Sequence, residues 1–166
     1  VAARLGVSYD KGMESRHDTG EDIAPEEAND IIQDLTMVMV LKDYGRDVTI
    51  ERPEGYDPTL FACACDNPIC LTPKEPGRLW SQQMMMSYGR LPGGKIMINW
   101  PIEGNDYYVD MIEMSAAERE EATNRAKQHT LCFLYFIQHE LGLNTLSLAD
   151  DEFPTDDKFP LMPYHR

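Results

Sequence analysis

The chain has 166 residues, about the length of one domain. It carries 15 Lys and Arg against 29 Asp and Glu, and the resulting charge of −14 argues against nucleic acid and anionic membranes as partners, because both select a basic surface. A hydrophobic content of 42% and a mean hydropathy of −0.46 are typical of a folded domain rather than a disordered chain. No apolar run approaches the roughly 20 residues that a membrane-spanning helix needs.

The elements predicted for the first part of the chain are short. Residues 1–5 are typical of the end of a helix, and residues 7–9 could form a short strand. The charged stretch 11–22 is expected to be a surface loop, and the proline and acidic residues of 24–28 indicate the start of a helix. Nearly every residue between 34 and 42 is apolar, which favours a strand buried on both faces.

A long irregular segment and a second strand are predicted next. Residues 46–76 are rich in Pro, Asp and Gly, and long loops of this kind are often functional. Residues 80–88 are expected to form a short helix or an irregular segment. Residues 95–100 follow a glycine-containing turn and predict a strand.

The most clearly defined element is a long helix. Ser115 and Glu118 have the spacing of a capping box, and Gly142 can terminate the helix, so the helix is predicted over about 115–141. Its second half is apolar on all sides and should therefore enter the core. Together the elements predict an α+β fold, mainly an antiparallel sheet with packed helices, in a single domain over residues 1–166.

The cysteines allow more than one interpretation. Cys63, Cys65 and Cys70 lie close together in the irregular segment, and Cys132 lies in the long helix. Cys63 and Cys65 make a poor local disulfide pair because one intervening residue leaves little freedom for good geometry. Their thiolates could bind zinc in a metal-stabilised interaction domain, although no second cysteine pair or nearby histidine completes a site. The alternative is a loop with small, partly buried thiols. The cysteines do not indicate the cellular compartment of the protein.

Most catalytic signatures are missing from the sequence. His139 and Glu140 begin a zinc-protease motif, but Leu143 replaces its second histidine. The sequence contains no glycine-rich dinucleotide motif, phosphate-binding loop or nucleophile elbow. His129 lies on an apolar helical stripe and is predicted to be a hydrogen-bonded histidine of the core or its boundary.

The segment 99–108 concentrates amides, a carboxylate and aromatic side chains at a turn that leaves a strand. This composition is typical of a site for a polar, flat or sugar-like ligand. The alternative is an ordinary aromatic turn whose Asn and Asp side chains bond to the local backbone.

Several stretches together resemble one family of proteins. They are residues 1–15, 32–36, 99–101, 104–107 and 163–166. They are similar to segments of the FAD-dependent oxidoreductase family, whose members have often been labelled xanthan-lyase-like. The glycine-rich FAD motif and the FAD-contacting C-terminal segment of that family are missing. The resemblance therefore implies a substrate-binding insert of a larger flavoprotein, with FAD as the cofactor of the parent enzyme.

The resemblance also implies partners and roles. The chain would bind a small-molecule substrate and contact the FAD-binding domain of the same parent chain, and the flavin would carry out hydride transfer. Alone it should neither bind FAD tightly nor turn over substrate. The implied substrate-binding residues are Asn99, Trp100, Asn105, Asp106, Tyr107 and Tyr164, and the implied catalytic residues are His165, which could move a proton, and Arg166, which could pair with an anionic group. The main alternative is a self-standing module that binds a carbohydrate or another polar ligand.

Overall fold

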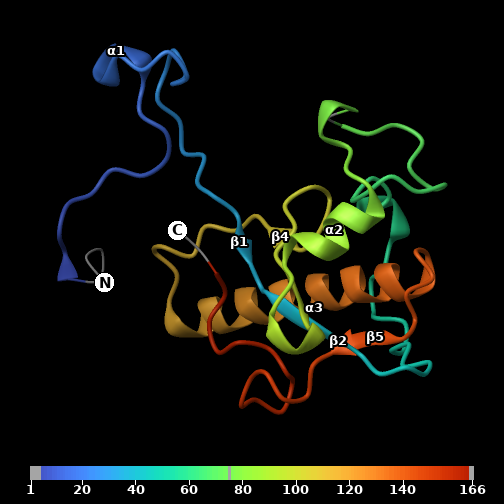
Figure 1. The fold of residues 1–166 in the computed structure, drawn as a ribbon. Coiled ribbons are helices and arrows are strands. Elements are labelled where there is room, and N and C mark those ends of the chain that lie inside the picture. Colours follow the sequence, from blue (N-terminus) through green and yellow to red (C-terminus); the bar gives the residue numbers. More distant parts are fainter. Residues whose placement is uncertain (1–4, 75, 165–166) are drawn as a thin grey trace.

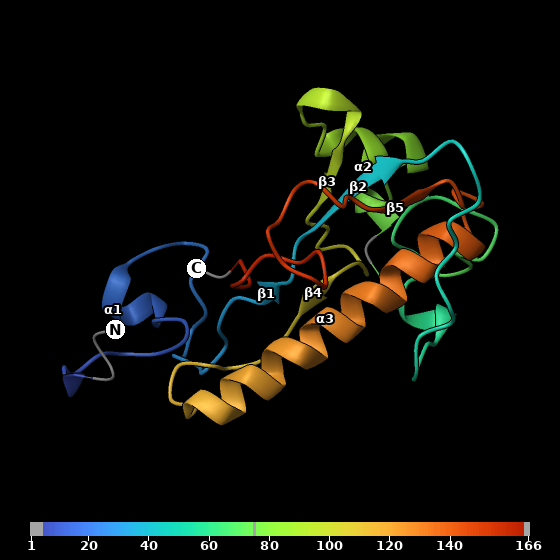
Figure 2. The same cartoon turned by 90° about the horizontal axis from the view of Figure 1, so that it is seen from below.

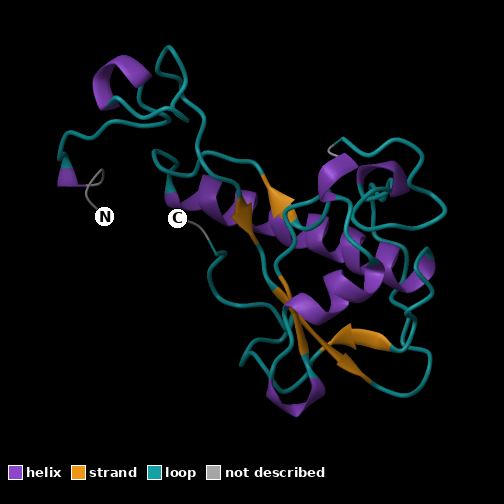
Figure 3. Ribbon diagram, turned by 45° about the horizontal axis from the view of Figure 1, so that its top comes forward, coloured by secondary structure: helices purple, strands orange, loops and turns teal. Residues whose placement is uncertain are grey.

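The computed structural model describes residues 5–74 and 76–164 and has an α+β fold (Figure 1). Its α-helices are α1 (Arg16–Thr19), α2 (Gln82–Tyr88) and α3 (Ala116–His139). Its strands are β1 (Leu35–Thr36), β2 (Met39–Asp43), β3 (Ile96–Ile98), β4 (Asp106–Tyr107) and β5 (Leu146–Leu148). Short 3-10 turns span Pro58–Leu60, Pro76–Arg78 and Pro92–Gly94. Long stretches of loop connect these elements (Figure 3).

The strands form two small antiparallel sheets. In one sheet β2 lies between β3 and β5, with Met39 opposite Ile98 and Leu41 opposite Leu148. In the other, β1 pairs with β4 so that Thr36 lies opposite Asp106. The backbone of Thr36 also exchanges two hydrogen bonds of 2.8 Å with Tyr164, so a third segment joins this sheet.

Both sheets lie against the long helix α3 (Figure 2). The predicted capping box is confirmed: the Ser115 hydroxyl accepts from the Glu118 N–H, and the Glu118 carboxylate accepts from the Ser115 N–H. The predicted entry into the core is confirmed as well, because Phe133, Phe136 and Ile137 are fully buried. Together with β2, they form the centre of the hydrophobic core.

The predicted strand over residues 34–42 is divided in two. The break falls at Met37, whose carbonyl accepts from the Thr130 hydroxyl at 2.9 Å and from the Asn105 amide at 3.2 Å. These side-chain donors satisfy the Met37 carbonyl in place of a neighbouring strand. The strand pairing is therefore interrupted between β1 and β2, and the two parts join different sheets.

The N-terminal predictions were less accurate. Residues 7–9 form no strand, and residues 24–28 form no helix. Instead α1 lies within the stretch expected to be a loop, capped by Ser15, and its Arg16 side chain donates to the Ala24 carbonyl. This bond and the one from the Arg16 N–H to the Pro25 carbonyl hold 24–25 against α1 in a non-helical form. The helix end predicted at 1–5 falls mostly outside the described residues.

The remaining elements follow the predictions closely. Residues 46–74 are irregular apart from one 3-10 turn, and α2 and β3 lie within the ranges predicted for them. The buried Gln138 of α3 fastens the irregular segment to the core, since its amide accepts from the Ile50 N–H and donates to the Val48 and Leu146 carbonyls. Within the described ranges, no helix has the combination of length and apolar character needed to cross a bilayer.

Candidate functional site

The turn that follows β3 is built around two buried side chains. Asn105 is fully buried; its side-chain oxygen accepts from the Trp100 N–H at 2.8 Å, and its amide donates to the Ile98 and Met37 carbonyls. The Trp100 indole N–H donates to the Ala64 carbonyl at 2.7 Å. The turn is therefore closed on itself and fastened to the cysteine-containing loop.

Two backbone features show how tightly this turn is folded. A Cβ on Gly104 would lie 2.2 Å from the Trp100 carbonyl oxygen, so no larger residue fits without a backbone shift. Glu103 has a φ of 46°, in the left-handed region that costs a non-glycine residue about 1–3 kcal/mol. The carboxylate of Glu103 accepts from the Cys63 N–H at 3.3 Å and lies 3.9 Å from the Lys74 ammonium group. The strained residue thus bridges the turn and the loop.

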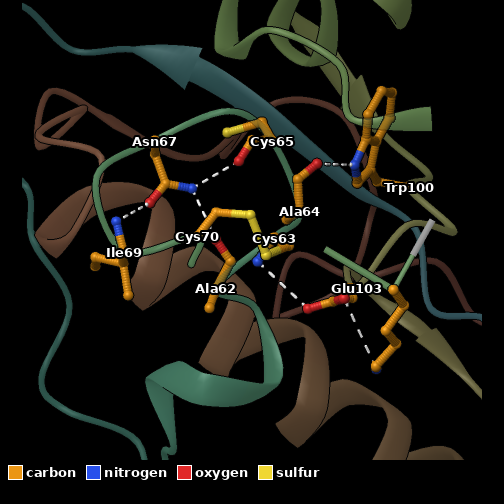
Figure 4. The surroundings of a disulfide bond; sticks show 10 residues. Ala62, Cys63, Ala64, Cys65, Asn67, Ile69, Cys70, Trp100 and Glu103 are labelled. Atoms are coloured by element: carbon orange, nitrogen blue, oxygen red, sulfur yellow. Dashed lines mark hydrogen bonds and ion pairs between the residues drawn. A yellow bond between two sulfur atoms is a disulfide. The ribbon is translucent and has the colours of Figure 1, made fainter. Parts of the chain in front are cut away.

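The loop opposite the turn is closed by a disulfide between Cys63 and Cys70 (Figure 4). Inside the loop, the Asn67 amide donates to the Ala62 and Cys65 carbonyls, and its oxygen accepts from the Ile69 N–H. The sequence did not indicate this pairing, because the seven-residue separation of the two cysteines marks no particular partner. The disulfide and the three hydrogen bonds of the half-buried Asn67 amide therefore hold this loop in one conformation.

Between the loop, the turn and α3 lies a pocket of about 350 Å³. Its polar lining comes from Asp34 before β1, Glu103 and Asp106 around the turn, His129 of α3, and Lys74 and Arg78 of the loop. The apolar lining includes Leu60, Leu79 and Ile102, and Cys63 of the disulfide also contributes. Convergent titratable groups in a concave, partly apolar site are the usual signature of small-molecule binding.

The imidazole of His129 is held in a fixed orientation. Its Nε2 lies 2.9 Å from the Gly104 carbonyl oxygen, and its ring centroid lies 5.2 Å from that of Phe61 and 5.8 Å from that of Tyr107. Burial lowers the pKa of His129 despite the opposing effects of the Gly104 carbonyl and the Asp106 charge. The ring is therefore neutral at pH 7, as expected for the hydrogen-bonded boundary histidine that the sequence predicted.

The carboxyl group of Asp106 shares this environment. Burial raises its pKa, and the nearby charge of Asp34 adds to the effect. The Thr36 hydroxyl donates a short hydrogen bond to the Asp106 carboxylate and partly offsets the cost of burying its charge. Asp34, Asp106 and His129 thus bring two carboxyl groups and an imidazole to the lining of the pocket.

The residues implied by the family resemblance are distributed around this site. Asp106 lines the pocket, and the Tyr107 ring packs near His129. Tyr164 pairs with Thr36 on the edge of β1 opposite to Asp106, and Asn99 is half-buried on the strand side of the turn. The side chains of Trp100 and Asn105 are engaged with the backbone, so they position the turn. His165 and Arg166 lie outside the described residues.

The sequence did not indicate several of the residues that line the pocket. His129 was identified as a boundary histidine but was not connected with the polar turn 99–108. Its one signal was a titratable side chain on an otherwise apolar face of a long helix. Asp34, Lys74 and Arg78 gave no signal, because only the fold brings their segments to one place.

A second hollow, of about 820 Å³, follows the first half of α3. Its lining is largely apolar and includes Ile31, Met111 and Leu161. The Arg119 guanidinium there is engaged with the Ile112 and Met114 carbonyls. Because fewer titratable groups converge in it, the pocket beside His129 is the better candidate for a small polar ligand.

The cysteine cluster does not have the ligands for a metal. The disulfide removes the thiolates of Cys63 and Cys70, and burial raises the pKa of the remaining Cys65 thiol to about 11. Over residues 5–74 and 76–164, no three His, Cys, Asp or Glu side chains are grouped as a metal site. The metal-stabilised domain considered from the sequence therefore has no ligand set here.

Comparison with protein families gives one match. A family model described as FAD dependent oxidoreductase matches residues 1–166, the whole chain. The chain belongs to the FAD-dependent oxidoreductase family. No curated protein and no solved structure matches it. Membership in the FAD-dependent oxidoreductase family implies FAD as the cofactor of the enzymes in that family.

The described residues of this FAD-dependent oxidoreductase chain do not fit FAD itself. Dinucleotide pyrophosphates are usually held where a parallel strand leads through a glycine-rich turn into a helix. All strand pairs in the described sheets are antiparallel. The first turn of the long helix α3 is capped by the chain's own Ser115. No step of flavin chemistry is therefore assigned to these residues.

Proposed function

We propose that this chain is the substrate-binding insert of an FAD-dependent oxidoreductase and that it binds a small polar substrate in the pocket beside His129. The observation that carries the proposal is the convergence of six polar or charged side chains from four separate segments on one pocket of about 350 Å³. Family membership supplies the reaction class. Hydride transfer to or from the substrate would be performed by the flavin, held by an FAD-binding domain of the same parent chain.

The pocket has the electrostatic character that a polar substrate needs. Asp34, Glu103 and Asp106 offer carboxylate oxygens, while Lys74 and Arg78 offer cationic donors at the same opening. The walls are firm because the disulfide and the buried Asn105 amide fix the loop and the turn. A site preorganised in this way orients its ligand at a low entropic cost. The same pocket would serve a self-standing binding module, but family membership favours the enzyme.

The proposal is tested by NMR titration of the ¹⁵N-labelled chain with small polyols, diamines and dicarboxylates. We expect at least one class to cause saturable shifts in the backbone amides of Lys74, Gly104 and Asp106. Asp34→Asn should weaken that binding about tenfold, the effect of losing one hydrogen bond to a charged group. Asp156→Asn, an equivalent change at an exposed residue, should leave it unchanged. Shifts confined to other parts of the chain, or none at all, would refute the proposed site.

A further inference from the structure

The hydrogen bond of His129 determines which of its ring nitrogens carries the proton. The Gly104 carbonyl oxygen, 2.9 Å from Nε2, can only accept, so Nε2 must be the donor. In a neutral imidazole the other nitrogen, Nδ1, then presents a lone pair and acts as an acceptor. The aromatic contacts with Phe61 and Tyr107 keep the ring from rotating away from this arrangement.

The acceptor nitrogen of His129 belongs to a side chain that lines the pocket. Among the residues that the structure describes, none forms a hydrogen bond with Nδ1, and no buried side-chain nitrogen or oxygen is without a partner. Nδ1 is therefore an accessible atom rather than a buried orphan, and the hollow that His129 lines is the pocket described above. Its neighbours Asp34 and Asp106 are acceptors when ionised.

We infer that Nδ1 of His129 accepts a hydrogen bond from a hydroxyl group of the substrate, so that the pocket selects alcohols and polyols. The inference rests on the proposed function and specifies its substrate class. A hydroxyl group can donate to Nδ1 or to the carboxylates, and it can accept from Lys74 or Arg78. A polyol can therefore bond with both the acceptor groups and the cationic donors of the pocket.

Charged small molecules fit less well. An ammonium group is attracted by the three carboxylates but is repelled by the Lys74 and Arg78 side chains. A carboxylate is attracted by Lys74 and Arg78 but is repelled by Asp34, Glu103 and Asp106, and it offers Nδ1 no hydrogen. A neutral hydroxyl group can both donate and accept, and it carries no charge that any of these groups repels.

The variant His129→Gln separates this role from a purely structural one. The glutamine amide can replace Nε2–H as the donor to the Gly104 carbonyl, while it places no acceptor where Nδ1 lies. We expect the variant to keep its far-ultraviolet circular dichroism and to unfold within a few degrees of the parent chain. Its affinity for erythritol should fall about tenfold, the loss expected for one well-formed hydrogen bond to a binding group.

The decisive measurement is the ¹⁵N spectrum of the histidine rings in the whole chain. The His129 signals, identified by their loss in His129→Gln, should show the tautomer with hydrogen on Nε2. Erythritol should shift the Nδ1 signal saturably, whereas ethylenediamine and succinate should not. A hydrogen on Nδ1 in the ligand-free chain would overturn the inference and leave the proposed pocket intact.

Two further outcomes separate the inference from the proposed function. Binding of ethylenediamine or succinate in the pocket, with none of erythritol, would overturn the substrate class alone, because the pocket would still be a ligand site. Erythritol binding that is weakened by Asp34→Asn but is unchanged in His129→Gln would overturn the role of Nδ1 alone. Failure of all three probes and of the wider set of compounds to bind would refute the proposed function and the inference with it.

Discussion

The buried amide of Asn105 offers the sharpest test of how the pocket is built. Asn105→Ala removes the acceptor of the Trp100 N–H and the donors to the Ile98 and Met37 carbonyls. The Met37 carbonyl keeps the Thr130 hydroxyl as a partner, but the Trp100 N–H loses its partner in a buried turn. An orphaned buried donor costs about 1–3 kcal/mol and each of the other two lost bonds about 1 kcal/mol, so a loss of about 3–5 kcal/mol is expected.

Such a loss is large against the roughly 5–15 kcal/mol that stabilises an ordinary domain. It is measured by urea unfolding, followed by tryptophan fluorescence and circular dichroism. Asn124→Ala, at an exposed position of α3, is the matched control and should change the free energy of unfolding by less than about 0.5 kcal/mol. Asn105→Asp retains the acceptor for the Trp100 N–H but turns a second acceptor towards two carbonyls, so it should also destabilise. A loss below about 1 kcal/mol in Asn105→Ala, with an unchanged denaturant slope, would refute the reasoning.

Two further perturbations test the walls of the pocket. Replacing Cys63 and Cys70 together by serine should lower the free energy of unfolding by about 2–3 kcal/mol, because a disulfide across so short a separation restricts the unfolded chain by that amount. Cys132→Ser serves as a control that leaves the disulfide intact. The change is measured by urea unfolding without reductant, and an equal stability of the double variant would argue against the bond. Because burial raises the pKa of Asp106, the folded chain holds a proton there that the unfolded chain has released, so this group makes the chain less stable as the pH rises between the two pKa values. Asp106→Asn should therefore raise the melting temperature relative to the parent chain at neutral pH but not in acid, and a difference independent of pH would contradict the assignment.

The parts of the fold that local rules govern could be predicted from the sequence. The capping residues Ser115 and Glu118 place the start of α3, and the apolar second half of the helix predicts its burial. The split between β1 and β2 could not be predicted, since it depends on Asn105 and Thr130, which lie 68 and 93 residues from Met37. In a single sequence, nothing connects a carbonyl with side-chain donors so distant along the chain.

The candidate site likewise has a part that could be predicted from local sequence and a part that could not. Composition identified the polar turn around Asp106, because amides and aromatic residues beside glycine are a local signal. The partners of that turn are His129 on α3 and the charged residues of the disulfide loop, and only tertiary structure brings them together. The pairing of Cys63 with Cys70 is local but could not be predicted either, since the spacing of the three clustered cysteines alone does not select a pair.

The acceptor groups and the cationic groups of the pocket differ in how firmly they are held, and this difference bears on specificity. On the acceptor side, His129 is fixed by the Gly104 carbonyl and two aromatic rings, and Asp106 by the Thr36 hydroxyl. On the donor side, the Lys74 side chain is 80% exposed and lies 3.9 Å from Glu103, a separation typical of a weak surface ion pair. Fixed groups discriminate between ligands, whereas an exposed lysine adjusts to them at little cost. This arrangement favours a specific selectivity. The fixed acceptor groups recognise a hydroxyl group, and the exposed lysine tolerates variation in the rest of the ligand.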